Sequence, residues 1–282
     1  MKYSISIIAL IFSLFSCNTE GVKKDESKSK LKDVKQSVKQ NDAVQALVPT
    51  KEIETVEDKN GLKITWFEHG KGELLKNEEV VQINYEVRLE DGTLVDGNQL
   101  LKRDWLPFIV GFGLQTPGWD LAFKKLKVGD FVEIVLPGDL ARGKAGIKDL
   151  IPPNAVNIIR VRVLDRIAPS RVIDGTKVWL LEENEKEKNL ANEESIIDFH
   201  YMVSSPSNPK YDISYRRADP FEMRFSDNGI VRGLKRAMIK AKKADKLWIV
   251  IPASEGYGNN GLVNLVKPGE SIFYDIFVMD VR

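Results

Sequence analysis

The sequence predicts an α+β protein built from two tandem copies of one small domain, each a curled antiparallel β-sheet wrapped around one short helix. Three observations support this fold class. The second half of the 282-residue chain repeats the first at a constant spacing, and most of each copy alternates apolar and polar residues as half-buried strands do. One amphipathic segment interrupts those strands in each copy.

The chain begins with an apolar leader. A short positive start precedes residues 4–15, which are almost wholly apolar, and Ser16 then places a small residue before Cys17. The run is too short to span a bilayer comfortably as a permanent helix, which is typical of a signal peptide. Its end resembles the lipobox of bacterial lipoproteins, so we expect residues 1–17 to be a lipoprotein signal peptide ending at a lipidated Cys17. Because Cys17 is the only cysteine, packed cores rather than disulfides must stabilise the fold.

Residues 18–50 are expected to form a flexible charged tether. Up to residue 40 this segment is rich in Lys, Ser, Asp and Glu and has scarcely any large apolar side chain, so it cannot bury enough surface to offset chain entropy. The remaining length suits two domains of ordinary size, which we place at residues 51–167 and 168–282. The formal net charge of +1 gives no basic field that would attract nucleic acid, so we expect no such partner.

Six pairs of residues carry the internal repeat. Each pair is separated by 115 positions: Gly118 and Gly233, Asp130 and Asp245, Pro137 and Pro252, Gly143 and Gly258, Pro153 and Pro268, Asp165 and Asp280. Further upstream the spacing drifts by one residue, and the segment NEEVVQINYEV corresponds to NEESIIDFHYMV. Agreement of this kind, mostly at Gly and Pro, is hard to obtain by chance and predicts two copies of one domain.

Each element of the first copy has its own pattern. Residues 79–90, 130–137 and 157–165 are rich in apolar and β-branched residues with partial or full alternation, which predicts half-buried antiparallel strands. One helix is expected over residues 118–126, because four apolar side chains there share one stripe: Trp119, Ala122, Phe123 and Leu126. The Gly-Asp step after this helix is expected to turn the chain into the next strand.

At this point the motifs match a known family. The segments YEVRLEDGTLVDG, PGWDLAFKKLKVGDFVEIVLPGDLARG, LIPPNAV and RVRVLD resemble the FKBP-type peptidyl-prolyl isomerases, and the second copy, with PFEMRFSDNGIVRGLKRAM and DKLWIVIPASEGYG, looks like a more diverged member. The resemblance implies that proline-containing peptides or unfolded exported proteins are the partners. It implies no cofactor and no metal, because a dry apolar pocket and one or two hydrogen bonds suffice to favour the twisted amide over a barrier of ~18–20 kcal/mol. The two histidines, His69 and His200, are then ordinary loop or strand residues.

In the first copy, the resemblance implies catalytic positions at Tyr85, Asp96, Trp119 and Ile151. Trp119 would be the floor of the site, and Asp96 would lie near a basic partner such as Arg103. The substrate-binding positions would be Val95, Leu106, Thr116, Arg142, Leu150 and Ile159. Several depart from the family: three aliphatic residues (Val95, Leu106 and Ile159) replace wall aromatics, Gln115-Thr116 replaces an apolar Val-Ile pair, and Arg142 replaces a tyrosine whose hydroxyl donates to the substrate.

In the second copy, the implied catalytic positions are Tyr201, Asp212 and Tyr257. The substrate-binding positions would be Tyr211, Phe221, Val231, Leu234, Val266 and Tyr274. Here Tyr257 restores the hydroxyl donor, whereas Leu234 replaces the tryptophan floor. The first copy therefore keeps the floor and loses the walls, and the second keeps most of the walls and loses the floor.

Three functions remain open after these departures. The chain can be a membrane-anchored peptidyl-prolyl cis-trans isomerase that assists the folding of exported proteins in the bacterial cell envelope. The lipid on Cys17 would then hold it to a membrane, which we expect to be the outer membrane, on its periplasmic or surface side. Alternatively, the fold serves a non-catalytic peptide-binding chaperone, or an envelope accessory lipoprotein in which the two copies act as spacers.

Overall fold

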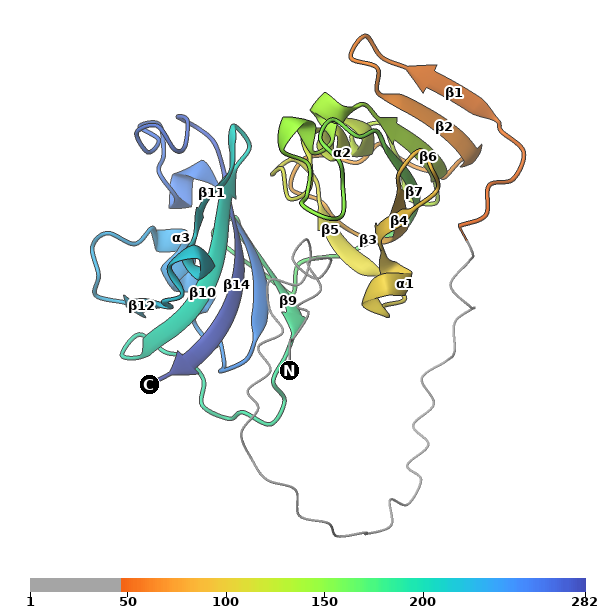
Figure 1. Cartoon of the computed structure of the whole chain (residues 1–282). Coiled ribbons are helices and arrows are strands. Elements are labelled where there is room, and N and C mark those ends of the chain that lie inside the picture. Colours follow the sequence, from red (N-terminus) through yellow and green to blue (C-terminus); the bar gives the residue numbers. More distant parts are fainter. Residues whose placement is uncertain (1–46) are drawn as a thin grey trace, which may run out of the picture.

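A computed structural model describes residues 47–282, so the signal peptide, Cys17 and most of the tether lie outside the described residues. Two seven-stranded antiparallel sheets follow one another along the chain, one for each sequence copy (Figure 1). The predicted α+β fold with two tandem domains is therefore confirmed. Within the described part of the chain, no helix combines the length and the apolar character that crossing a bilayer requires.

The first domain contains the strands β1 to β7. Its sheet has the order β1-β2-β6-β7-β3-β4, and β5 also pairs with β3. The strands are β1 (Glu54–Glu57), β2 (Lys63–Glu68), β3 (Val80–Arg88), β4 (Leu94–Gly97), β5 (Leu106–Ile109), β6 (Phe131–Leu136) and β7 (Asn157–Arg166). Two helices interrupt them, α1 (Asn98–Leu101) and α2 (Pro117–Phe123). The four-residue α1 was not expected from the sequence, because it is a single turn without an amphipathic stripe.

The second domain contains the strands β8 to β14. Its sheet has the order β11-β10-β14-β13-β9-β8, and β12 also pairs with β10. The strands are β8 (Arg171–Ile173), β9 (Thr176–Glu182), β10 (Ile196–Ser205), β11 (Asn208–Ile213), β12 (Phe221–Arg224), β13 (Lys246–Ile251) and β14 (Ile272–Val281). One helix, α3 (Arg232–Met238), packs on this sheet. The break between the two sheets falls between residues 166 and 171.

A glycine at the start of each main helix lets the helix lie close to its sheet. A Cβ built on Gly118 of α2 would stand 2.5 Å from a methyl group of Leu136, and one built on Gly233 of α3 would stand 2.3 Å from Ile251. These two contacts are equivalent in the repeat, because Gly233 follows Gly118 by 115 positions and Ile251 follows Leu136 by the same number. The helix predicted over residues 118–126 ends at Phe123, but the predicted stripe of Trp119, Ala122, Phe123 and Leu126 is buried in the first core, as expected.

The turns after the helices are fixed by two equivalent aspartates. Asp130 is buried and accepts hydrogen bonds from the backbone N–H of Gly70 (2.6 Å) and of Lys127 (2.9 Å). Asp245 accepts from the backbone N–H of Asn184 and of Lys242, both at 2.9 Å. Each aspartate thus closes the turn before the next strand and also ties the preceding segment of its domain to that turn.

A third apolar core joins the two domains. Its buried members come from both sequence copies: Val80, Ile109, Phe112 and Leu114 from the first, and Trp179, Met202, Ile213, Trp248, Val250 and Phe273 from the second. Strand β13 is buried on both faces, because Leu247, Ile249 and Ile251 belong to the second domain's own core while Trp248 and Val250 belong to the shared one. The outer face of the second sheet is therefore covered by the first domain.

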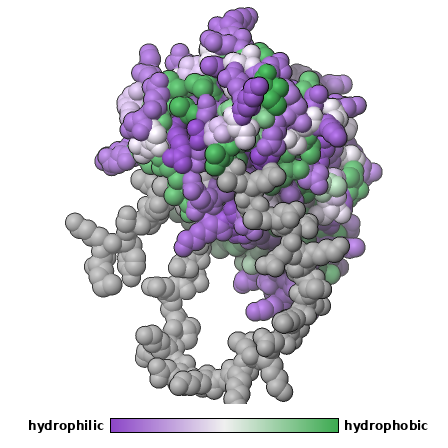
Figure 2. Space-filling view, turned by 90° about the vertical axis from the view of Figure 1, so that its right-hand side faces the viewer, coloured by the Kyte–Doolittle hydropathy of each residue, from purple (hydrophilic) through white to green (hydrophobic). Residues whose placement is uncertain are grey.

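Polar contacts at the edge of the shared core help to fix the position of one domain relative to the other. Glu78 of the first domain accepts a hydrogen bond from the Ser271 hydroxyl at 2.7 Å and pairs with Lys177 at 3.0 Å. Arg103 lies 3.6 Å from Glu182. By contrast, the face shown in Figure 2 is mainly hydrophilic, and its apolar residues form separate patches. Large apolar residues thus gather between the domains and not on that outer face.

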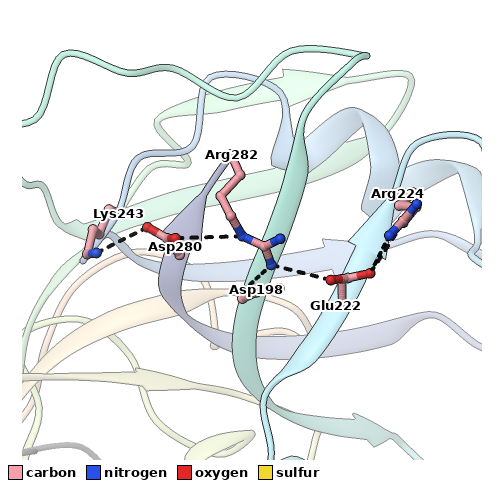
Figure 3. Close-up of polar contacts among 6 residues, drawn as sticks. All are labelled: Asp198, Glu222, Arg224, Lys243, Asp280 and Arg282. Atoms are coloured by element: carbon pink, nitrogen blue, oxygen red, sulfur yellow. Dashed lines mark hydrogen bonds and ion pairs between the residues drawn. The ribbon is translucent and has the colours of Figure 1, made fainter.

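At the far end of the second sheet, six charged side chains form a network across β10, β12 and β14 (Figure 3). Arg282 pairs with Asp198, with Glu222 at 3.3 Å and with Asp280 at 3.7 Å. The outer members are Arg224, which is 2.9 Å from Glu222, and Lys243, which is 3.1 Å from Asp280. Because all six are solvent-exposed or partly so, this network contributes less to stability than the apolar cores do.

Removing a ring from the shared core should destabilise the protein and separate the unfolding of its domains. Phe112 is fully buried, and its ring centre is 5.4 Å from that of Phe273. We expect Phe112→Ala to lower the free energy of unfolding by about 3–5 kcal/mol, the range seen for buried aromatic truncations. Scanning calorimetry should resolve two transitions where the parent shows one. The control Trp105→Ala removes a ring that is 41% exposed and should cost at most about 0.5 kcal/mol. An unchanged single transition in Phe112→Ala would contradict the coupling.

Candidate functional site

The residues implied by the family resemblance come together in each domain, between the sheet and the main helix. In the first domain, Tyr85, Val95, Trp119, Ile151 and Ile159 belong to one buried cluster, and Leu106 and Leu150 pack against it. In the second domain, Leu234, Val266 and Tyr274 are buried in the equivalent cluster, and Tyr201, Tyr211, Val231 and Tyr257 pack against it. Phe221 joins them through its ring contact with Tyr201 at 6.0 Å.

The second domain presents a group of aromatic rings that remains partly open to solvent. The ring of Tyr201 lies perpendicular to that of Phe221 and 5.9 Å from that of Tyr274. Phe221 is 37% exposed, and Tyr211 and Tyr257 are partly exposed, whereas Leu234 is buried beneath them. A large ring exposed beside other aromatic rings can take up an apolar group from a partner.

A hydrogen-bonded triad holds one side of this aromatic group. The Tyr201 hydroxyl donates to Asp212, and Arg217 donates to Asp212 at 2.5 Å and to the Tyr201 hydroxyl at 3.1 Å. Burial opposes the charged form of Asp212, but the hydrogen bonds from Arg217 and Tyr201 outweigh it and hold the pKa of Asp212 below its ordinary value. Burial, together with Asp212, raises the pKa of Tyr201 to about 12. The triad therefore keeps a carboxylate and a neutral phenol in fixed positions at neutral pH.

Two further hydroxyl groups of the second domain stay protonated at neutral pH. Burial raises the pKa of Tyr257 and that of Tyr211 above the ordinary value. The Tyr211 hydroxyl is buried and has no hydrogen-bond partner among the described residues. A buried hydroxyl without a partner is costly, so a carbonyl group that reaches it would gain a hydrogen bond at little expense.

The first domain's site has a floor as deeply buried as that of the second domain, and its walls are aliphatic. Trp119 is only 3% exposed and lies among other rings: 5.3 Å from Tyr85, 5.6 Å from Phe108 and 5.6 Å from Phe123. Val95 and Ile159, which replace wall aromatics, are fully buried. The smaller walls have therefore not left Trp119 open to solvent. Its indole ring packs as part of the domain's own core.

Asp96 of the first domain lacks the arginine partner that its counterpart has. It is 4% exposed and accepts a hydrogen bond from the backbone N–H of Gly97 at 2.8 Å. Burial raises the pKa of Asp96, and the nearby charge of Arg142 opposes that rise only in part. The expectation that Arg103 would be its basic partner is wrong, because Arg103 pairs with Glu182 across the domain boundary.

Arg142 stands beside the first site, where the second domain has Tyr257. Its guanidinium donates a long hydrogen bond (3.5 Å) to the side-chain oxygen of Gln115. Burial lowers the pKa of Arg142, and Asp96 and Tyr85 raise it. Arg142 remains a cation at neutral pH because its ordinary pKa is above 12.

Sequence reasoning missed one residue of the second site. Arg217 was not expected, although the signal was present: it follows Asp212 by five positions, on a short 3₁₀ turn over Ser214–Arg217. In the first copy the chain between Asp96 and β5 forms α1 instead, and no arginine is placed at an equivalent distance. Within the described residues, no three His, Cys, Asp or Glu side chains gather as a metal site would require.

Comparison with known proteins assigns the family. The family model for FKBP-type peptidyl-prolyl cis-trans isomerases matches residues 71–164 and again residues 187–279, together more than half of the chain. The chain therefore belongs to the FKBP-type peptidyl-prolyl cis-trans isomerase family and carries two FKBP domains in tandem.

Individual relatives cover different parts of the chain. Peptidyl-prolyl cis-trans isomerase FKBP9 of Homo sapiens is 27% identical over 201 residues, which are 71% of this chain and 34% of the relative. FKBP-type peptidyl-prolyl cis-trans isomerase FkpA of Escherichia coli is 36% identical over 107 residues, 37% of each protein. The crystal structure of FkpA is similar over 40% of this chain and 51% of that one, with 34% identity and a TM-score of 0.37. The chain thus spans about a third of the length of these curated relatives.

The two equivalent aspartates should respond to pH in opposite directions. The folded pKa of Asp212 is lowered, so its stabilising effect is complete above the unfolded value near ~4 and is lost as pH falls through the folded pKa. The folded pKa of Asp96 is raised, so its carboxylate destabilises the fold at neutral pH, and this cost disappears as pH falls through the folded pKa.

Asparagine variants test this prediction in urea titrations from pH 7 to pH 3. At pH 7, Asp212→Asn should lose of the order of 1 kcal/mol, since solvent screens part of this half-exposed pair, and Asp96→Asn should match or exceed the parent. Both differences should shrink toward pH 3 as the parent's carboxylates become protonated. A difference that grows on acidification, in either variant, would contradict the assignment.

Proposed function

We propose that this chain is a peptidyl-prolyl cis-trans isomerase and that its second domain carries most of the activity. The observation that supports this assignment is the partly exposed aromatic group around Phe221, with the neutral Tyr257 hydroxyl beside it. The family membership supports the reaction class. The aliphatic side chains at the wall positions of the first site, Val95, Leu106 and Ile159, support a lesser catalytic role for the first domain.

The chemistry follows from the nature of the X-Pro bond. Rotation breaks amide resonance, and the twisted amide is less dipolar than the planar one, so an apolar aromatic surface favours it. The Tyr257 hydroxyl would donate to a substrate carbonyl and hold the chain while the bond turns. No proton is transferred to or from the amide, and a ~10⁴-fold acceleration requires only about 5–6 kcal/mol. Leu234 in place of a tryptophan floor makes the second domain weaker than a site with a complete aromatic floor.

A second candidate function has its own support. The first domain keeps the fold but has aliphatic walls at its site, and the shared apolar core joins it to the second domain. A pair of linked domains can hold an unfolded chain without isomerising it, which is the action of a non-catalytic peptide-binding chaperone. Suppression of client aggregation by a variant without isomerase activity would favour this function over the first.

The cellular setting is proposed from the leader alone. The apolar run before Cys17 and the charged segment that follows support a lipid anchor and a tether. On that basis the protein would be held to a membrane of the bacterial cell envelope, on the outer membrane's periplasmic or surface side, where it would assist the folding of exported proteins. Radiolabelled palmitate incorporation that is lost in Cys17→Ala tests the anchor.

Removing one hydroxyl should locate the active domain. Tyr257→Phe keeps the ring and deletes the proposed donor, so kcat/KM for a proline peptide should fall about 2- to 10-fold, as expected for one hydrogen bond. A protease-coupled isomerisation assay on the full chain measures this ratio. The matched variant Arg142→Gln alters the equivalent position of the first domain and should change kcat/KM for an uncharged peptide by less than about 2-fold, because that site has aliphatic walls in place of aromatic ones. The reverse pattern would assign the activity to the first domain.

A further inference from the structure

Three cationic side chains converge where the second domain meets the first domain's site. Arg142 belongs to the first domain, Lys210 to the β10–β11 hairpin and Arg216 to the 3₁₀ turn that follows β11. Burial, followed by the like charges of Arg142 and Arg216, lowers the pKa of Lys210 to about 8. Lys210 is therefore a partly buried cation that feels the like charges of Arg142 and of the exposed Arg216.

Backbone packing places the hairpin beside the first site. A Cβ built on Gly113 would stand 2.4 Å from the ring of Pro209, so the residue before Lys210 lies directly against the chain that leads into α2. Two residues further along that chain is Gln115, whose side-chain oxygen is 3.5 Å from Arg142. The hairpin stands on the side of the second domain that faces the first (Figure 1). The hairpin of the second domain therefore lies at the edge of the first site.

None of the three cations forms an ion pair with a carboxylate in the described part of the chain. Across residues 47–282, no carboxylate lies within 4.0 Å of the charged groups of Arg142, Lys210 or Arg216. The nearest acidic influence is Asp96, which acts on Arg142 only through the field and is itself buried with a raised pKa. Placing like charges together without a counter-ion costs stability, so a bound anion would relieve a strain that is already present.

Two buried polar groups next to Arg142 also lack partners. The side-chain N–H₂ of Gln115 and the hydroxyl of Thr116 have no hydrogen-bond partner in the described part of the chain. Gln115 is 8% exposed and Thr116 is 4% exposed, so water does not readily satisfy them. Unsatisfied buried donors are rare in folded proteins, and they are found where a ligand completes the hydrogen bonding. They provide an observation independent of the charges.

We propose that Arg142, Lys210 and Arg216, with Gln115 and Thr116, form a composite subsite for a peptide carboxylate at the junction of the two domains. The first domain would then select peptides that carry an acidic residue beside proline. This inference rests on the proposed function in one respect: Arg142 and Thr116 occupy positions that hold the substrate in this family. A carboxylate suits the group, because guanidinium and ammonium donors bind it through charge-assisted hydrogen bonds.

The bound carboxylate can belong to an Asp or Glu side chain or to the C-terminus of a peptide. Peptides that carry only one of the two groups distinguish these sources. Fluorescence anisotropy would measure how the full-length protein binds three dye-labelled proline peptides that differ only in the residue before proline and in the C-terminal group. One has Glu before Pro and an amidated end, one has Gln before Pro and an amidated end, and one has Gln with a free C-terminal carboxylate. We expect the Glu peptide to bind about 10-fold more tightly than its amidated Gln counterpart, and the preference to fall in 0.5 M salt.

Variants locate the preference. Lys210→Gln and Arg216→Gln should each reduce the Glu-over-Gln preference to about 3-fold or less, whereas Lys186→Gln, an exposed lysine of the second domain, should leave it intact. Equal binding of the Glu and Gln peptides, or a preference that survives both variants, overturns the subsite. Tight binding of the free-carboxylate peptide, if lost in Lys210→Gln, supports the subsite with the chain end as its ligand. Isomerase turnover measured on the same samples tests the proposed function separately, because an acidic preference without turnover overturns only the enzyme assignment.

Discussion

The apolar contact between the two domains is the interaction on which the rest of the arrangement depends. Trp248, Val250 and Phe273 project from the outer face of the second sheet and are covered by Ile109, Phe112 and Leu114 of the first domain. An exposed apolar face of this kind would favour association with other chains, so its burial within one chain is a requirement of solubility as well as of stability. Because β13 is buried on both faces, separating the domains would expose apolar residues of each to solvent.

This contact also gives the two sites different surroundings. The first site has the second domain's hairpin at its edge, with Pro209 against Gly113, and its former wall positions are filled by small buried side chains. The second site faces away from that contact and keeps Phe221 partly exposed. Two copies of one domain have thus diverged in different directions, one toward aliphatic walls with a cationic edge and one toward aromatic walls without a tryptophan floor.

The two domains also differ in the pKa of their equivalent aspartates. Asp212 has a tyrosine and an arginine as hydrogen-bond donors, which stabilise its charge despite partial burial. Asp96, at the equivalent position, is more deeply buried, and the backbone N–H of Gly97, the Tyr85 hydroxyl and the charge of Arg142 offset that burial only in part. The same residue type therefore has a lowered pKa in one domain and a raised pKa in the other, because a pKa is set by the neighbours and not by the position in the repeat.

Local and repeated patterns let the sequence alone determine the two-domain α+β fold, the helix stripe around Trp119 and the residues that gather at each site. The fold and the helix stripe follow from periodicity and from the spacing between the two copies, whereas the site residues follow from the resemblance to the FKBP family. Only the tertiary structure decided the pairing of Arg103 with Glu182, the burial of Val95 and Ile159, and the position of the β10–β11 hairpin beside the first site. In the sequence, the unbroken apolar run of β13 indicates that both faces of this strand are buried. It does not predict which surface covers the outer face. Contacts between residues a hundred positions apart depend on how two complete domains dock, and no local pattern records that geometry.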